Sequence, residues 1–289
     1  MIIHELDQNI CDPKKIGVSY GSGGQRGVIH LGVIKAFIKL GIKPDHIVGA
    51  SAGSIAAGLH AFDPDNDDLV NLAVNILKKI KPGDFGISFI QILGRVLTEN
   101  FHLQGLGDLS GFKKIADKNL PFKNIEDAKV PLGIVATNRL NGQEAWFEKG
   151  SVTDAMMASS SVPGLFPPYK IGDGLYVDGG FTDGLPMFKL AKAGCGTIIA
   201  INLGYSGNSN QAPANLVDNL LGSIDILGYQ STRYETELIK ALYPKLKVID
   251  LKPEVALDIT PADLMNPEKV DTIIDESYQK SLKLIPELI

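Results

Sequence analysis

The sequence predicts an α/β protein with a mainly parallel sheet. Short apolar runs, such as residues 15–20 and 197–203, are typical of buried strands, and stretches with apolar residues at helical spacing separate them. Between residues 15 and 50 a strand, a glycine loop, a helix and a second strand follow one another, which is the order of a βαβ unit. The length allows one large domain or two small ones. We find no repeat and no linker in the sequence, so we predict one domain over residues 1–289.

The composition narrows the possible partners and compartments. The formal net charge is -5, and no basic stripe is present that could neutralise the phosphates of a nucleic acid. The two cysteines, Cys11 and Cys195, lack the spacing of a disulfide framework or a zinc site. The N-terminus does not have the pattern of a secretory signal, and no apolar run is long enough to span a membrane. We therefore expect a soluble, cytoplasmic protein of undetermined oligomeric state.

The remaining elements follow from apolar periodicity and from cap and turn residues. In the N-terminal half we expect a strand at 15–20, a glycine loop at 21–27, a helix ending at Gly41, a strand from His46, a helix after Ser51, and a helix over 69–80 capped by Asp65 or Asn66. In the C-terminal half we expect strands at 130–138, 144–148, 175–177, 197–203 and 247–251, a hairpin turn at Asn141-Gly142, and helices capped by Ser151, starting near Pro186, spanning 214–227 and beyond, and starting at Asn266-Pro267.

Residues 84–112 are less regular. Apolar residues between 89 and 97 have helical spacing, and glycines flank them on both sides. Such a segment could be a lid or a surface that makes transient contact with a membrane, but it is more often a core helix.

A serine lies in a motif that is typical of nucleophilic enzymes. Ser51 is the centre of Gly49-Ala50-Ser51-Ala52-Gly53, between an apolar strand and a run of small residues that starts a helix. This is the G-x-S-x-G elbow, in which glycines let neighbouring backbone approach a serine on a strained turn. The positive end of the helix dipole can stabilise a developing oxyanion. The alternative is a small-residue turn of an ordinary α/β protein.

The glycine loop at 21–27 is a candidate anion site. Its successive N–H groups, with Gly23 and Gly24 at the centre, can form a concave anion site, and Arg26 adds a positive charge. A dinucleotide fingerprint starting at Gly21 fails because its last position is Arg26. Beside the serine elbow, the loop is placed where an oxyanion hole is expected. The alternative is a flexible turn.

A carboxylate is the expected base for Ser51. The five histidines are residues 4, 30, 46, 60 and 102, and none follows the candidate acid Asp178 as the order Ser, acid, His requires. We predict structural or surface roles for them, although folding could bring His102 near. Asp178 is flanked by Gly179 and Gly180, which leave its carboxylate unhindered. Asp173 and Asp183 are nearby rivals that we interpret as turn residues.

Taken together, the glycine loop at 22–27, the serine elbow and the Asp178-Gly179-Gly180 sequence resemble the patatin-like phospholipases. The resemblance covers about residues 16–204, with C-terminal helices and a strand at 205–289 outside it. It implies a three-layer α/β/α sandwich that acts on acyl esters of lipids without a metal or cofactor. The roles it implies are a Ser-Asp dyad of Ser51 and Asp178, an oxyanion hole of Gly23 and Gly24 helped by Arg26, and supporting glycines at Gly27, Gly49, Gly53, Gly179 and Gly180.

Two positions depart from the family pattern. Ser22 replaces the first glycine of the loop, and Gly184-Leu185-Pro186 replaces the usual Asn-Pro after the aspartate. Neither touches the dyad. We predict a serine acyl hydrolase of phospholipase A, lysophospholipase or esterase type. The alternatives are an acyltransferase with the same dyad and an inactive lipid-binding protein.

Overall fold

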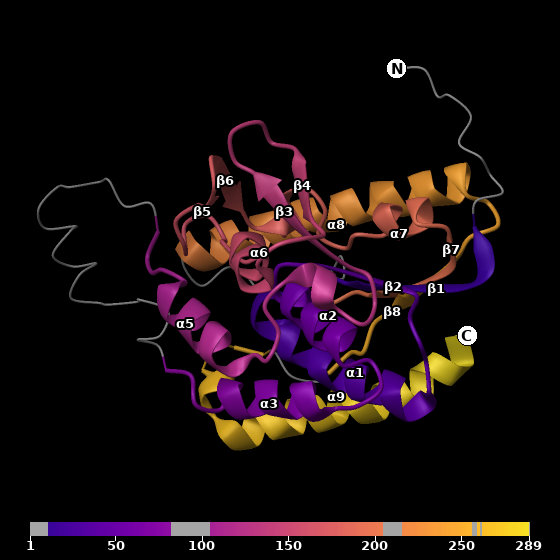
Figure 1. Ribbon diagram of the computed structural model, residues 1–289, viewed down its shortest axis with the longest axis horizontal. Coiled ribbons are helices and arrows are strands. Elements are labelled where there is room, and N and C mark those ends of the chain that lie inside the picture. Colours follow the sequence, from indigo (N-terminus) through magenta and orange to yellow (C-terminus); the bar gives the residue numbers. More distant parts are fainter. Residues whose placement is uncertain (1–10, 82–104, 205–215, 256–258, 261, 289) are drawn as a thin grey trace, which may run out of the picture.

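An eight-stranded sheet lies between two layers of helices in the computed structural model (Figure 1), which describes residues 11–81, 105–204, 216–255, 259–260 and 262–288. The strands are β1 (Asp12–Tyr20), β2 (His46–Ala50), β3 (Leu132–Asn138), β4 (Glu144–Phe147), β5 (Tyr169–Ile171), β6 (Gly174–Val177), β7 (Cys195–Ile201) and β8 (Lys247–Leu251). Their order is β5-β6-β3-β2-β1-β7-β8, and β4 pairs with β3. The five strands from β3 to β8 in this order are parallel, whereas β4, β5 and β6 pair antiparallel. The predicted mainly parallel sheet is confirmed.

The helices form the outer layers. They are α1 (Ile29–Leu40), α2 (Ala52–Phe62), α3 (Asp68–Leu77), α5 (Ser110–Asn119), α6 (Val152–Ser159), α7 (Phe188–Lys192), α8 (Leu216–Leu242) and α9 (Pro267–Leu288), with 3-10 turns η1 (Gly24–Val28), η3 (Ile125–Asp127), η4 (Gly179–Phe181) and η5 (Asp263–Met265). Alternate residues of each strand point to opposite faces of a sheet. Val48 accordingly packs in one core with Leu190 of α7 and Ile239 of α8. Its neighbour Ile47 packs in the other core with residues of α1, α2 and α9. The three-layer sandwich is therefore confirmed.

The C-terminal part of the chain completes both the sheet and a helix layer. β8 pairs in parallel with β7, and α9 lies along α1 (Figure 1). Ser277 Oγ of α9 donates a 2.6 Å hydrogen bond to the carbonyl of Ile29. Gly32 allows this approach, because a Cβ there would lie 2.4 Å from the carbonyl oxygen of Ile274. Among the residues placed in the structure, no helix is both long and apolar enough to cross a membrane.

Several local predictions can be compared with the structure. Gly41 ends α1 with a left-handed φ of 68°, and Ser151 caps α6 by accepting from the N–H of Asp154. The hairpin between β3 and β4 is confirmed. The predicted cap of α3 is wrong, because Asp67 occupies the N-cap position. We did not predict α5 or β5, and the apolar segment at 89–97 lies outside the described residues.

Candidate active site

Ser51 occupies a sharp turn between β2 and α2. Its φ of 53° and ψ of -128° make it the one non-glycine residue with positive φ in the described part of the chain. Such a backbone costs on the order of 1–3 kcal/mol and persists only where the surrounding structure fixes it. The turn directs the serine away from the strand and puts it at the start of a helix, as the elbow motif predicts.

Strand register brings Asp178 to Ser51. β2 pairs with β3 up to Ala50 opposite Val135, and antiparallel β6 pairs with β3 down to Val177 opposite Thr137. Ser51 and Asp178 are the next residues after these two pairs. Both therefore lie beside Ala136 of β3, the residue between Val135 and Thr137. The sequence predicts that Asp178 follows a strand, but not that this strand runs antiparallel and meets β2 end to end.

The two side chains form a direct hydrogen bond. Ser51 Oγ donates to Asp178 Oδ2 at 2.5 Å. Only 6% of Ser51 and 4% of Asp178 is exposed. The other carboxylate oxygen, Oδ1, accepts from the N–H of Gly180 at 2.8 Å. The backbone of Asp178 is also held, because its N–H donates to Ser161 and its carbonyl accepts from Thr137 Oγ1.

A second set of polar contacts fixes the elbow itself. The N–H of Ser51 donates to Ser159 Oγ at 2.8 Å, and that hydroxyl donates to the carbonyl of Val135 at 2.6 Å. Ser54 Oγ donates to the carbonyl of Ser51 at 2.6 Å. Sequence reasoning missed Ser159 and Thr137 as supports of the site. Only their polarity inside apolar segments could have indicated them.

Burial makes Asp178 a stronger base than an exposed aspartate. Desolvation raises its pKa from 3.8 to about 6, against the hydrogen bonds from Ser51 and Gly180, which favour the charged form. The negative charge of Asp225 on α8 raises the pKa further. Asp178 is thus ionised near neutral pH and still able to accept a proton.

The glycine loop begins directly after Tyr20 of β1, which pairs with Gly49, two residues before Ser51. Gly21 and Ser22 use their N–H groups on the carbonyls of Ile201 and Gly184. The next two along the chain are those of Gly23 and Gly24, and Gly24 has a φ of 52° that favours glycine.

Two further contacts place this loop. Arg26 forms a 3.3 Å ion pair with Asp225. Ser22 Oγ is buried without a hydrogen-bond partner in the described part of the chain and would lie 2.9 Å from a Cβ on Gly180. Ser22, which stands where the family has a glycine, therefore packs against the turn after Asp178.

The supporting glycines mark places where backbone segments touch. A Cβ on Gly27 would lie 2.5 Å from the Cβ of Ala52, so η1 packs directly on the start of α2. The other close approaches, given as the distance from such a Cβ to the nearest atom, are 2.4 Å to Gly53 O at Gly49, 2.2 Å to Tyr20 O at Gly53, and 2.3 Å to Val135 O at Gly179. At each of these places a larger side chain would push the loop, elbow or aspartate turn off its neighbour.

Two of the three histidines in the described chain, His30 and His60, have other hydrogen-bond partners. His30 Nε2 bonds to the carbonyl of Gly21 at 2.8 Å, and His60 Nδ1 to the hydroxyl of Tyr20 at 2.7 Å. Burial lowers the pKa of both His30 and His60 to about 4. They support the structure as neutral rings, as predicted, and His4 and His102 lie outside the described residues. Of the rival aspartates, Asp173 is exposed in the β5–β6 turn, whereas Asp183 is buried.

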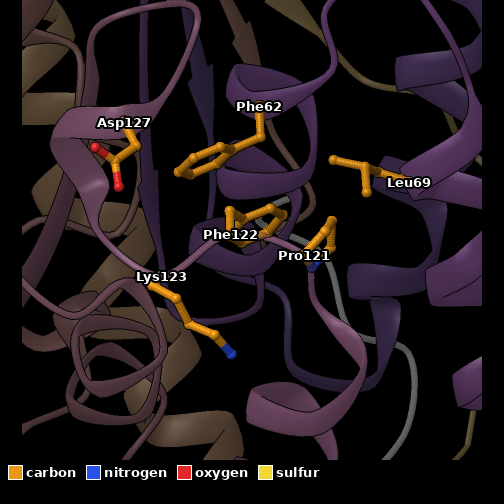
Figure 2. Close-up of a pocket in the computed structure, with 6 residues that line it drawn as sticks. All are labelled: Phe62, Leu69, Pro121, Phe122, Lys123 and Asp127. Atoms are coloured by element: carbon orange, nitrogen blue, oxygen red, sulfur yellow. The ribbon is translucent and has the colours of Figure 1, made fainter.

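A pocket of about 370 Å³ lies at the opposite end of α2 (Figure 2). Its lining includes Phe62 and Phe122, whose rings stack with centroids 3.9 Å apart. Phe62 is the last residue of α2 and Ser51 precedes the first, so about 16 Å of helix separates them. The pocket is therefore not part of the dyad's surroundings.

Comparisons with known proteins agree with these motifs. The family model for patatin-like phospholipases matches residues 18–191. An uncharacterised NTE family protein of Mycobacterium tuberculosis is 31% identical over 209 residues, which are 70% of this chain and 53% of that protein. Lysophospholipase NTE1 of Saccharomyces cerevisiae is 31% identical over 214 residues, 74% of this chain and 12% of the yeast protein.

A solved structure with a related description is human GIVD cytosolic phospholipase A2. It has a TM-score of 0.46 and 13% identity, with 100% of this chain and 60% of that chain covered. The chain spans about half the length of the mycobacterial relatives it matches, and a much smaller share of the yeast ones.

Proposed function

The chain belongs to the patatin-like phospholipase family, and from that premise we propose that it is a serine acyl hydrolase that cleaves carboxylic esters of lipids. The observation that carries the proposal is the 2.5 Å hydrogen bond from Ser51 Oγ to Asp178 Oδ2 in a buried setting. A serine needs a group that takes its proton as it attacks, and Asp178 is that group.

The reaction has two steps with the same proton acceptor. Ser51 Oγ attacks the ester carbonyl carbon while its proton passes to Asp178 Oδ2. The N–H groups of Gly23 and Gly24 hold the oxyanion of the tetrahedral intermediate. When the intermediate collapses, the alcohol leaves with the proton from Asp178, and the acyl group stays on Ser51. Water then attacks the acyl-enzyme, Asp178 takes its proton, and Ser51 recovers that proton as the acid leaves.

The substrate class is a lipid ester: a phospholipid, a lysophospholipid or a neutral acyl ester. The yeast relative is named a lysophospholipase, so a single-chain phospholipid is the first substrate to test. The preferred head group and chain length depend on contacts beyond the dyad.

Substitution of each dyad residue in turn tests the proposal. We expect Ser51→Ala and Asp178→Asn each to lower kcat for p-nitrophenyl ester and lysophospholipid cleavage by on the order of a thousandfold or more, because each removes a group that acts on the transferred proton. Far-UV circular dichroism checks that both variants are folded. A fluorophosphonate should label Ser51 in the wild-type protein and not in Ser51→Ala.

The matched control is Asp173→Asn, an exposed carboxyl group five positions before Asp178. It should cleave esters at the wild-type rate. Full activity of Asp178→Asn would show that another group takes the proton, and absence of a Ser51 adduct would favour a lipid-binding protein.

A further inference from the structure

A second pair of carboxyl groups lies next to the catalytic turn. Asp183 follows η4, the turn that starts directly after Asp178, and only 6% of it is exposed. Glu235 of α8 is half-buried, and its carboxyl group is in hydrogen-bond contact with that of Asp183. We call these two residues the carboxyl pair. It joins the turn that carries Asp178 to α8, which lies in the same helix layer as α7 (Figure 1).

The contacts of the pair indicate where its proton lies. Two carboxyl groups share a hydrogen bond only when one of them carries a proton. Glu235 Oε1 accepts from the N–H groups of Met187 at 3.1 Å and Phe188 at 2.7 Å, which favours its ionised form. Asp183 accepts one N–H, from Leu185, and its Oδ1 is buried without a partner in the described chain. Asp183 is therefore the protonated member and donates to Glu235.

The charges around the pair also favour a bound proton. Burial is the main reason that the pKa of Glu235 is raised to about 7 and that of Asp183 well above its ordinary value. Glu144 of β4 raises both further by its negative charge. The nearby cations are engaged elsewhere: Lys189 of α7 pairs with Glu148, and Arg233 of α8 lies over a tyrosine ring. In the described part of the chain, neither member forms an ion pair with Lys or Arg.

We propose that Asp183 and Glu235 are positioning residues, which hold the Asp178 turn against α8 through one shared proton and release it when that proton is lost. The proposal rests on the hydrolase function proposed above. The N–H of Asp183 donates to the carbonyl of Gly179 at 2.9 Å, so that movement of Asp183 moves η4. The N–H of Gly180, in the same turn, holds Asp178 Oδ1. When the proton leaves to solvent at alkaline pH, two negative charges repel each other and the dyad geometry is lost.

Three variants separate the shared proton from simple packing. Asp183→Asn keeps a donor towards Glu235 and an acceptor for Leu185 but does not titrate, so it should keep kcat at pH 7 within about threefold of wild type and extend activity to alkaline pH. Asp183→Ala removes the clamp and should lower kcat by about tenfold or more, since small misplacement of a catalytic group is costly. Glu235→Gln removes the charge of the pair and keeps an amide oxygen that can accept from Asp183, but Asp183 still titrates, so this variant should lie between the two.

Two readouts are measured from pH 5 to 9: kcat for ester cleavage, and the free energy of unfolding in denaturant. Because the pKa of Asp183 is raised well above its ordinary value in the folded state, the stability that the proton contributes is complete at low pH and is lost as the pH rises through that raised pKa. On the alkaline side of this range, above the titration of Asp178, the wild-type protein should lose both activity and stability, and Asp183→Asn should lose neither. Glu237→Gln, an exposed exchange on α8, is the matched control and should behave as wild type.

Different outcomes overturn different claims. An unchanged alkaline limb in Asp183→Asn, or full activity in Asp183→Ala, would overturn the positioning role. If Asp183→Ala does not fold, the two amide variants still decide the question. If the wild-type protein cleaves no ester, the hydrolase proposal fails, whereas the pH dependence of unfolding still tests the shared proton.

Discussion

Asp178 is both ionised and a useful proton acceptor near neutral pH, whereas an exposed aspartate is ionised but too weak a base. It is ionised near neutral pH, yet burial keeps its pKa at about 6, closer to the working pH of a base than 3.8. The rise from 3.8 to about 6 corresponds to roughly 3 kcal/mol by which burial disfavours the charged form. The protein therefore loses stability as the pH rises through about 6, in exchange for a base that can serve Ser51.

The pH profile of ester cleavage should report this group. We expect kcat/KM to rise with pH up to about 6, because only ionised Asp178 can accept the serine proton, and to fall about tenfold per pH unit below that value. Asp225→Asn removes a charge that raises the pKa of Asp178. The acidic limb of the kcat/KM profile should therefore move to lower pH in this variant. Steady-state rates in constant-ionic-strength buffers measure both.

Asp271→Asn provides the comparison, because Asp271 is an exposed carboxyl group on α9 that pairs with Lys78. Its limb should coincide with that of the wild-type protein. A limb that stays in place in Asp225→Asn would contradict the electrostatic influence of α8 on Asp178.

At the residue scale, the sequence was sufficient to single out Ser51 and Asp178, which the structure brings together, but not the residues that support them. Ser51 and Asp178 are flanked by glycines that indicate close backbone contact, and the absence of a histidine after residue 102 points to a carboxylate base. Ser159 and Glu235 carry no such local pattern. Their partners lie 108 and 48 positions away, so only the folded chain defines their roles.

At the element scale, the packing of η1 on the start of α2 determines where the glycine loop lies. Gly27 has no room for a methyl group, because its Cβ would lie 2.5 Å from that of Ala52. η1 begins at Gly24 and Gly23 precedes it, and we assign the N–H groups of these two glycines to the oxyanion. A shift of η1 would therefore reach the site.

Gly27→Ala should lower both activity and stability. We expect a loss of about 1–3 kcal/mol in the free energy of unfolding from overpacking, and a lower kcat because the loop donors move from the oxyanion. Denaturant titration and ester kinetics measure the two effects. The control is Gly222→Ala, on α8, where a Cβ meets no atom within 4 Å. Wild-type kcat in Gly27→Ala would contradict the assignment of the oxyanion donors.

The elements that sequence reasoning missed have weak local patterns. α5 buries only Ala116 fully and has just two other large apolar residues, Phe112 and Ile115, so its apolar pattern is short. β5 has three residues and forms because β6 offers a partner, which no local pattern reveals. β3, β7 and α9 were recognisable because each has a long apolar run or a clear helix start. Tertiary contacts determine α5 and β5, whereas the local sequence is enough to predict β3, β7 and α9.

On the scale of the whole molecule, the segment beyond the matched family region is integrated into the fold. β8 extends the sheet next to β7, and α9 covers α1. These contacts support our proposal of a single domain. The sequence predicted the strand at 247–251 and the helix from Pro267, but not that they complete the sheet and the layer beneath it.

Gly32→Ala should test how much the α1–α9 contact contributes. A Cβ at this position would lie 2.5 Å from Ser277 Oγ, so α9 must move and its bond to Ile29 is strained. We expect a loss of about 1–3 kcal/mol from this overpacking. Lys39→Ala, an exposed exchange on the same helix, should leave the denaturation midpoint nearly unchanged. Equal midpoints for both variants would indicate that α9 is only loosely attached.

β2 and β6 both end beside Ala136 of β3. The alignment of Ser51 with Asp178 therefore depends on the number of residues in this one strand. Backbone pairing with β3 places the serine and the aspartate opposite each other, and the Thr137 side chain adds a hydrogen bond to Asp178. Adding or removing one residue between Val135 and Thr137 would offset one of them by about 3.3 Å, more than the length of their hydrogen bond. We therefore expect the turn between β3 and β4 to tolerate an inserted residue, and β3 itself not to.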